Sequence, residues 1–196
     1  MIPKNKITPF GSILKDALNP TPPAVNTAYT QAAVLLPFIT RNDVRHLIFT
    51  RRTMTVATHK GQISFPGGMM DPQDSSPDDT ALREAHEEIG LPAQNVEIVG
   101  YLHGMQTVTD FWITPVVGVV TSPFTYLLAE AEVAEVFEVP LDALMVTSAW
   151  ELGDREYNGV VYRDCRFRWK GHIIWGVTGK LTWSLMTRLA THFAEC

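Results

Sequence analysis

The 196-residue chain is long enough for one domain with a sizeable core, and its 45% hydrophobic content, which includes five Trp, excludes an intrinsically disordered chain. A formal net charge of −5 excludes the strongly basic surface that nucleic-acid binding favours, and no apolar run reaches the length of a membrane span. The N-terminal residues lack the apolar core of a signal peptide, so we expect a cytoplasmic protein with no nucleic-acid or membrane partner. In that compartment Cys165 and Cys196 are expected to be reduced thiols, not a disulfide or zinc ligands.

Residues 1–28 contain five prolines and little hydrophobic periodicity. We expect them to form an arm that lies on the domain, with a short helix near Ile13–Leu18. Such an arm is a candidate contact surface for a homodimer. The remaining residues, 29–196, are expected to form one domain.

Continuous apolar runs and two-residue alternation predict the strands of this domain. They cover Gln31–Ile39, His46–Arg51, Gln62–Phe65, Val96–Leu102, Trp112–Val120 and Val160–Trp169. Turns are expected at Arg41–Asp43, between the first two strands, and at Tyr157–Gly159, before the last. A polar loop, His103–Asp110, is a candidate border of a binding site.

Helices are expected from Pro77 to the stop at Gly90, over Pro140–Met145 and over Trp175–Phe193. In the last of these, Leu181, Leu185 and Leu189 recur every four residues and should lie in the core. Strands on both sides of a central helix, followed by a closing helix, predict an α/β fold with a mixed sheet.

The central helix carries three glutamates on one side. At about 100° per residue, Glu84, Glu87 and Glu88 fall within an arc of roughly 100°. Carboxylates this crowded repel each other, and a hard divalent cation with oxygen ligands offsets that repulsion. The alternative is a solvated acidic face, but only Arg83 interleaves it. The preceding residues, Pro66-Gly67-Gly68, are expected to form a loop in which the glycines permit close backbone approach, which suits a diphosphate beside a metal.

This stretch resembles the Nudix box, whose pattern is G, five residues, E, seven residues, R-E-U-x-E-E-x-G-U, with U apolar. Gly68 opens the pattern and residues 83–91, REAHEEIGL, close it without a gap. Asp74 stands where the pattern has its first Glu, and eight residues separate it from Arg83. The resemblance implies the Nudix fold, a mixed β-sheet between α-helices.

The resemblance also implies a diphosphate hydrolase. Glu84, Glu87 and Glu88 would hold one or more Mg²⁺ or Mn²⁺ ions, and Arg83 would orient a helix carboxylate. The general base stays open: a box glutamate is one candidate, and Glu132, expected to face solvent, is a weaker one.

Residues 47–68 are similar to the motif that precedes the box in the coenzyme A pyrophosphatase branch of Nudix hydrolases, with Ala57 where that motif has its second Arg. The similarity implies a coenzyme A-type substrate and residues that bind it. These are Arg51, Arg52, His59, Lys60, Gly67 and Gly68. One of the five Trp residues, or Phe111, is a candidate to stack on adenine, and the sequence does not indicate which one. Two alternatives remain: a Nudix pyrophosphatase for another nucleoside diphosphate derivative such as ADP-ribose, and a non-catalytic nucleotide sensor.

Overall fold

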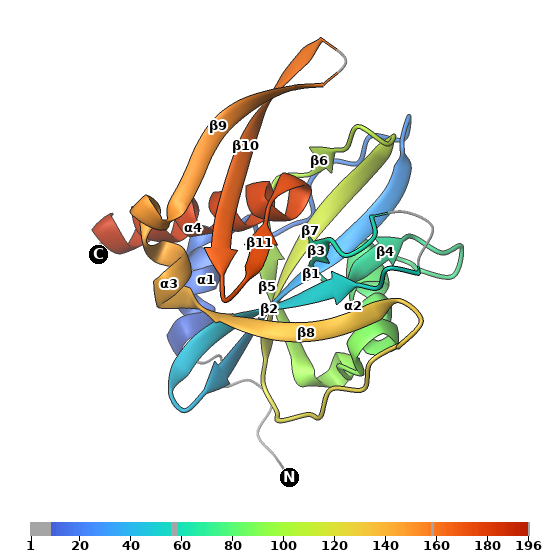
Figure 1. Cartoon of the computed structure of the whole chain (residues 1–196). Helices are drawn as coiled ribbons and strands as arrows, with labels where there is room; N and C mark the ends of the chain where they lie inside the picture. Colours follow the sequence, from blue (N-terminus) through green and yellow to red (C-terminus); the bar gives the residue numbers. More distant parts are fainter. Residues whose placement is uncertain (1–8, 56–58, 158, 196) are drawn as a thin grey trace.

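The computed structural model describes residues 9–55, 59–157 and 159–195 (Figure 1). The helices are α1 (Pro9–Ala17), α2 (Pro77–Ile89), α3 (Leu141–Met145) and α4 (Gly176–Glu195), with short 3-10 turns η1 (Ala93–Asn95) and η2 (Thr147–Ala149). The strands are β1 (Thr30–Arg41), β2 (Val44–Arg52), β3 (Ile63–Ser64), β4 (Gly67–Met69), β5 (Val96–Tyr101), β6 (Met105–Gln106), β7 (Phe111–Val120), β8 (Val133–Pro140), β9 (Trp150–Tyr157), β10 (Val160–Trp169) and β11 (His172–Ile174).

The larger sheet is mixed, as predicted. Strands β1 and β7 run parallel at its centre, and its other pairs are antiparallel. The strand order is β3-β2-β1-β7-β5, with β4 on β1, β6 on β7 and β8 on β2. A second sheet, in the order β11-β10-β9, is antiparallel. Its β9–β10 hairpin projects beyond the rest of the molecule (Figure 1).

Strand β1 explains why the first predicted strand is a continuous apolar run. Leu35 and Ile39 face one core cluster, together with α2, whereas Leu36 and Phe38 face the other, together with α1 and α4. A strand covered on both faces has no solvent side, so its alternation disappears from the sequence. The helices lie on both sides of the large sheet (Figure 1), which confirms the predicted α/β arrangement.

Strands β1 and β2 diverge, and a short segment fills the space between them. They pair from Arg41↔Val44 to Phe38↔Leu47. Beyond that point β1 pairs with β4 and β2 pairs with β3. We call residues 61–69 the wedge. Gly67 and Gly68, which we expected in a loop, lie instead in β4 of this wedge.

Several other expectations are corrected. Helix α1 begins at Pro9, earlier than predicted, and the segment contributes Phe10, Leu14 and Leu18 to the core. Strands β4, β6, β8, β9 and β11 were not predicted, because they are short or interrupted by charged and glycine residues. The core positions of Leu181, Leu185 and Leu189 are confirmed.

The division into a 1–28 arm and a 29–196 domain, and the homodimer, remain predictions. Cys165 is a buried free thiol, and Cys196 and Ala57 lie outside the described residues. Within the described part of the chain, every helix is too short or too polar to cross a membrane.

Candidate active site

Helix α2 has the limits that its end signals predict. The Ser76 hydroxyl accepts a hydrogen bond from the Asp79 N–H at 3.2 Å, and Pro77 occupies the first turn. At the other end Gly90 has φ 71°, the left-handed conformation that favours glycine, and its N–H bonds carbonyls of the last turn. Because Ala85 and Ile89 are buried against the sheet, the glutamates point toward the wedge side or outward.

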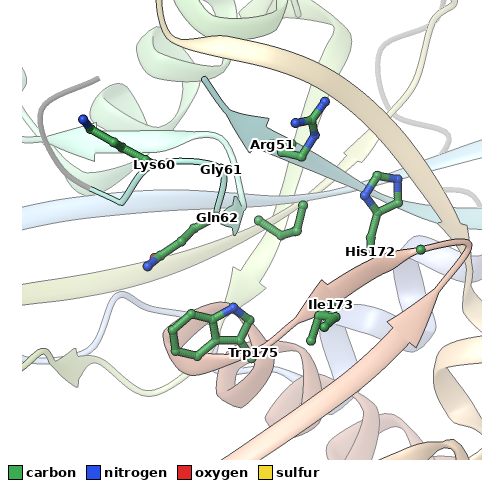
Figure 2. Close-up of a pocket in the computed structure, with 9 residues that line it drawn as sticks. Arg51, Lys60, Gly61, Gln62, His172, Ile173 and Trp175 are labelled. Atoms are coloured by element: carbon green, nitrogen blue, oxygen red, sulfur yellow. The ribbon is translucent and has the colours of Figure 1, made fainter. Parts of the chain in front are cut away.

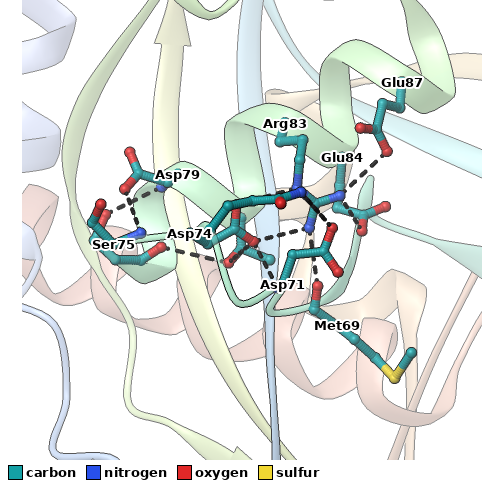
Figure 3. Close-up of polar contacts among 11 residues, drawn as sticks. Met69, Asp71, Asp74, Ser75, Asp79, Arg83, Glu84 and Glu87 are labelled. Atoms are coloured by element: carbon teal, nitrogen blue, oxygen red, sulfur yellow. Dashed lines mark hydrogen bonds and ion pairs between the residues drawn. The ribbon is translucent and has the colours of Figure 1, made fainter.

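Arg83 is the centre of the polar contacts on this helix (Figure 3). Its Nε and Nη2 donate to Asp74 at 3.2 and 3.0 Å, and Nη2 also donates to the Met69 carbonyl at 3.0 Å. Its Nη1 donates to Glu84 at 2.9 Å and to Glu87 at 3.2 Å. Arg83 therefore makes charge-assisted hydrogen bonds to two helix carboxylates, and its orienting role stays a prediction.

Asp74, the departure from the box pattern, anchors that arginine. Its side chain is 5% exposed and also accepts hydrogen bonds from the Thr80 hydroxyl and the Asp71 N–H, both at 2.9 Å. The Arg83 guanidinium is the largest cause that lowers the pKa of Asp74 to about 2. The carboxylate is thus ionised at neutral pH and fixed at the start of α2.

Glu88 is a buried carboxyl group on the glutamate side of α2. Its side chain is 5% exposed, and its Oε2 is buried without a hydrogen-bond partner. Burial, followed by the charge of Glu84, raises its pKa to about 8, against the lowering influence of Arg52 and of the Gly67 N–H. The Arg52 Nη1 is 3.9 Å away, too far for a hydrogen bond. An orphaned buried carboxylate oxygen of this kind would be satisfied by a cation.

Gly68 leaves the space that Glu84 occupies. A Cβ atom at Gly68 would overlap the Glu84 carboxylate, and one at Gly67 would overlap the backbone of Ala33 and Val34. Burial raises the pKa of Glu84 as well, and the charges of Glu87 and Glu132 add to that rise. The glycines of the wedge therefore let the chain pass directly beside the glutamates.

Glu132 is closer to the site than the sequence suggested. It is exposed, as expected, yet its charge contributes to the raised pKa of both Glu84 and Glu88. Its position comes from its backbone, since its carbonyl accepts the Thr53 N–H at 2.9 Å at the end of β2. A single glutamate before an unpredicted strand carries no sequence signal of this proximity.

The donor set fits a hard divalent cation in its chemistry. Glu84, Glu87, Glu88 and Glu132 supply only carboxylate oxygens, and the buried Glu88 Oε2 lacks a partner. Within the described residues, no three acidic, His or Cys side chains are already close enough to share one ion. Arg83 holds Glu84 and Glu87 instead. Three of these glutamates could share one ion only after their side chains move.

A cavity of about 400 Å³ lies beside the wedge (Figure 2). Its lining residues come from β2, the wedge and the segment around β11: Arg51, Lys60, Gly61, Gln62, Ile63, Gly171, His172, Ile173 and Trp175. Of the cations predicted to bind substrate, Arg51 and Lys60 line this cavity, whereas Arg52 faces Glu88. His59 is exposed and bonds Gln62 at 2.9 Å.

Two residues of this region, Glu135 and His172, were not predicted as site residues. Glu135 on β8 accepts from Arg51 Nε at 2.9 Å and lies 3.3 Å from His172 Nε2. His172 and Trp175 line the cavity from β11 and the start of α4. The sequence named Trp175 only as one of several aromatic candidates, because the contact between β11 and β3 joins residues that are far apart in the chain.

The chain has a mixed sheet between helices, and a helix with three glutamates follows a glycine-rich segment. These two features together define a protein family. The NUDIX domain family matches residues 29–158, and the chain belongs to this family. Membership of this family makes it a Nudix hydrolase, an enzyme that acts on pyrophosphate bonds.

Its relatives carry the same family name. The chain is 37% identical over 164 residues to NudL of Photorhabdus laumondii, an uncharacterised Nudix hydrolase, covering 84% of this chain and 87% of that protein. It is 40% identical over 148 residues to NudL of an Enterobacter species, covering 76% and 77%.

Solved structures share the fold. An Ap4A hydrolase from C. elegans, in a binary complex, aligns with a TM-score of 0.54 at 14% identity, over 85% of this chain and 99% of that one. A MutT/Nudix family protein from Enterococcus faecalis aligns with a TM-score of 0.54 at 14% identity, over 86% of this chain and 64% of that one.

Proposed function

We propose that this Nudix hydrolase cleaves the diphosphate bond of coenzyme A or its derivatives, giving 3′,5′-ADP and 4′-phosphopantetheine or its acyl form. The observation that carries the proposal is the wedge. Its glycines contact the Glu84 and Glu88 side chains, and Gly61–Ile63, with Lys60 just before it, line a cavity that also holds Arg51. Coenzyme A has a diphosphate and a separate 3′-phosphate, so it suits an acidic metal site with fixed positive charge nearby.

Glu84, Glu87 and Glu88 would hold Mg²⁺ or Mn²⁺. When bound, the ion neutralises diphosphate oxygens and makes a bound water more acidic. Arg83 positions Glu84 and Glu87 through its Nη1, and Asp74 fixes the guanidinium from the other side. Water adds to phosphorus, the anhydride P–O bond breaks, and one phosphate monoester leaves.

The proton of the attacking water passes to a carboxylate, for which two candidates remain. A box glutamate is one. Glu132 is the other. The structure supports it more strongly than the sequence did, because the charge of Glu132 raises the pKa of both Glu84 and Glu88. An exposed carboxylate beside the site can exchange its proton with solvent after each turnover.

The test is incubation of the purified protein with coenzyme A and Mg²⁺, followed by mass spectrometry of the products. We expect 3′,5′-ADP and 4′-phosphopantetheine to appear together. The Glu88→Gln variant should lose turnover by orders of magnitude, whereas the control Glu156→Gln, on the exposed face of β9, should keep it. Intact coenzyme A after prolonged incubation with the wild-type protein would overturn the proposal. Ligand binding without product would support the sensor alternative.

A further inference from the structure

Two adjacent arginines on β2 serve different sites. Side chains alternate along a strand, so Arg51 and Arg52 point to opposite faces of the large sheet. Arg52 lies beside Glu88 on the α2 face. Arg51 lines the cavity on the other face with His172. The cavity is therefore separate from the glutamates, although the wedge joins the two over a few residues.

The cavity carries a net positive set of side chains. Arg51 and Lys60 are fixed cations, and Glu135 is the carboxylate in contact with this set. Glu135 binds Arg51 through Nε alone, which leaves the terminal nitrogens of the guanidinium as further donors. It also lies 3.3 Å from His172 Nε2, so one carboxylate fixes two groups that line the cavity. Such a set suits a phosphate monoester.

An aromatic surface completes this cavity. Trp175 is 38% exposed, whereas Trp150 is buried in the core. His172 is held flat on Phe137, with ring centroids 4.1 Å apart and an interplanar angle of 9°. Figure 2 shows Arg51 and His172 on one side of the cavity, Lys60 and Gln62 on the other, and Trp175 below them. A half-exposed indole is a platform on which a nucleobase stacks.

We propose that this cavity binds the 3′-phosphorylated adenosine end of the substrate. The 3′-phosphate lies against Arg51 and His172, with the charge of Lys60 across the cavity, the adenine stacks on Trp175, and Glu135 is a positioning residue. The proposal deepens the proposed function, on which it rests for the identity of the ligand. Residues 63 and 67 of the wedge are at most about 14 Å apart along the chain, so a ligand in the cavity can keep its diphosphate beside the glutamates.

The test measures binding without hydrolysis. Isothermal titration calorimetry in EDTA compares 3′,5′-ADP with 5′-AMP, which lacks the 3′-phosphate. We expect wild-type protein to bind 3′,5′-ADP at least tenfold more tightly than 5′-AMP. Arg51→Gln and His172→Gln should each reduce that preference to about threefold or less. Trp175→Leu should weaken both ligands by about tenfold and leave the preference intact.

Two control variants lie outside the cavity, one at another histidine and one at another exposed aromatic residue. His46→Gln, at the other end of β2, and Phe193→Leu, near the end of α4, should leave both affinities unchanged. Equal wild-type affinities for the two nucleotides would overturn the inference, as would a preference that neither Arg51→Gln nor His172→Gln reduces.

Failure of this binding site can be distinguished from failure of the proposed reaction. Cleavage of coenzyme A without a 3′-phosphate preference would leave the proposed function standing and reject this site. The predicted preference without cleavage would support the site and reject the reaction.

Discussion

Asp74 accepts hydrogen bonds from both Nε and Nη2 of Arg83, at 3.2 and 3.0 Å. The pair joins the connection before α2 to the helix that carries the glutamates. The Nudix box has Glu where this chain has Asp74, with one residue fewer before the arginine. In this chain a shorter side chain on a longer connection reaches the guanidinium.

The first prediction concerns this pair. Asp74→Asn should lower the unfolding free energy by about 3 kcal/mol at pH 7, because it leaves a largely buried guanidinium without its main carboxylate. Chemical denaturation measures the change. The control is Asp71→Asn, whose carboxylate is half-exposed and 3.9 Å from Arg83, and which should cost less than about 1 kcal/mol. Equal costs for the two variants would contradict this role of Asp74.

The second prediction is a pH dependence caused by Glu88. Its pKa of about 8 in the folded protein lies above the ordinary value for Glu. The folded state therefore keeps a proton that the unfolded chain releases. Unfolding free energy should fall as pH rises from about 4.3 to 8, by roughly 5 kcal/mol in metal-free protein.

Glu88→Gln stays neutral throughout that range, so it should remove this part of the fall. Thermal unfolding in EDTA from pH 4 to pH 9 measures both curves. Wild-type and variant proteins with parallel curves would show that Glu88 titrates normally.

The third prediction follows from the same proton. At pH 7 most Glu88 side chains are protonated in the metal-free protein, and a metal ligand must be deprotonated. Mg²⁺ or Mn²⁺ binding should therefore release close to one proton. Calorimetry in two buffers with different ionisation enthalpies measures the number released. A binding enthalpy that is independent of the buffer would contradict the assignment of Glu88 as a ligand.

The fourth prediction separates two neighbouring glycines. Gly68→Ala should weaken metal binding, because its Cβ displaces the Glu84 carboxylate, the movable end of a side chain. Gly67→Ala should mainly destabilise the fold, because its Cβ meets the backbone of Ala33 and Val34. Gly153→Ala is the control, since a Cβ there meets no atom within 4 Å. Metal titration and thermal unfolding of the three variants provide the comparison.

The fifth prediction separates the adjacent arginines. Arg52→Gln should raise the pKa of Glu88 further and change metal affinity at pH 7, because Arg52 lowers that pKa and its charge lies 3.9 Å from the carboxyl group. Arg51→Gln should leave metal affinity unchanged and raise KM for coenzyme A. Metal titration and steady-state kinetics distinguish the two. A common effect of both substitutions would show that the sites are not separate.

The features predicted correctly from the sequence are local ones. The limits of α2 follow from Ser76, Pro77 and Gly90, whose capping roles depend on a few neighbouring residues. The glutamate arc follows from helical geometry. The buried strand β1 follows from its continuous apolar run, and the leucines of α4 from their spacing.

What the sequence did not predict depends on long-range pairing. Arg51 and Glu135 are 84 positions apart, and they meet because β2 pairs with β8 along most of its length. The position of His172 depends likewise on β11 reaching the wedge. The sequence did not indicate that the side chains of Arg51 and Arg52 lie on opposite faces of the large sheet, because the predicted strand ended at Arg51.

Direct competition between substrates tests the central claim most directly. Coenzyme A and ADP-ribose are mixed at equal concentration with Mg²⁺ and a small amount of the protein. The rates at which the two substrates disappear give the ratio of their kcat/KM values. We expect coenzyme A to be consumed at least tenfold faster, with 3′,5′-ADP as product and no consumption of either in EDTA. Faster loss of ADP-ribose, with coenzyme A intact, would contradict the account.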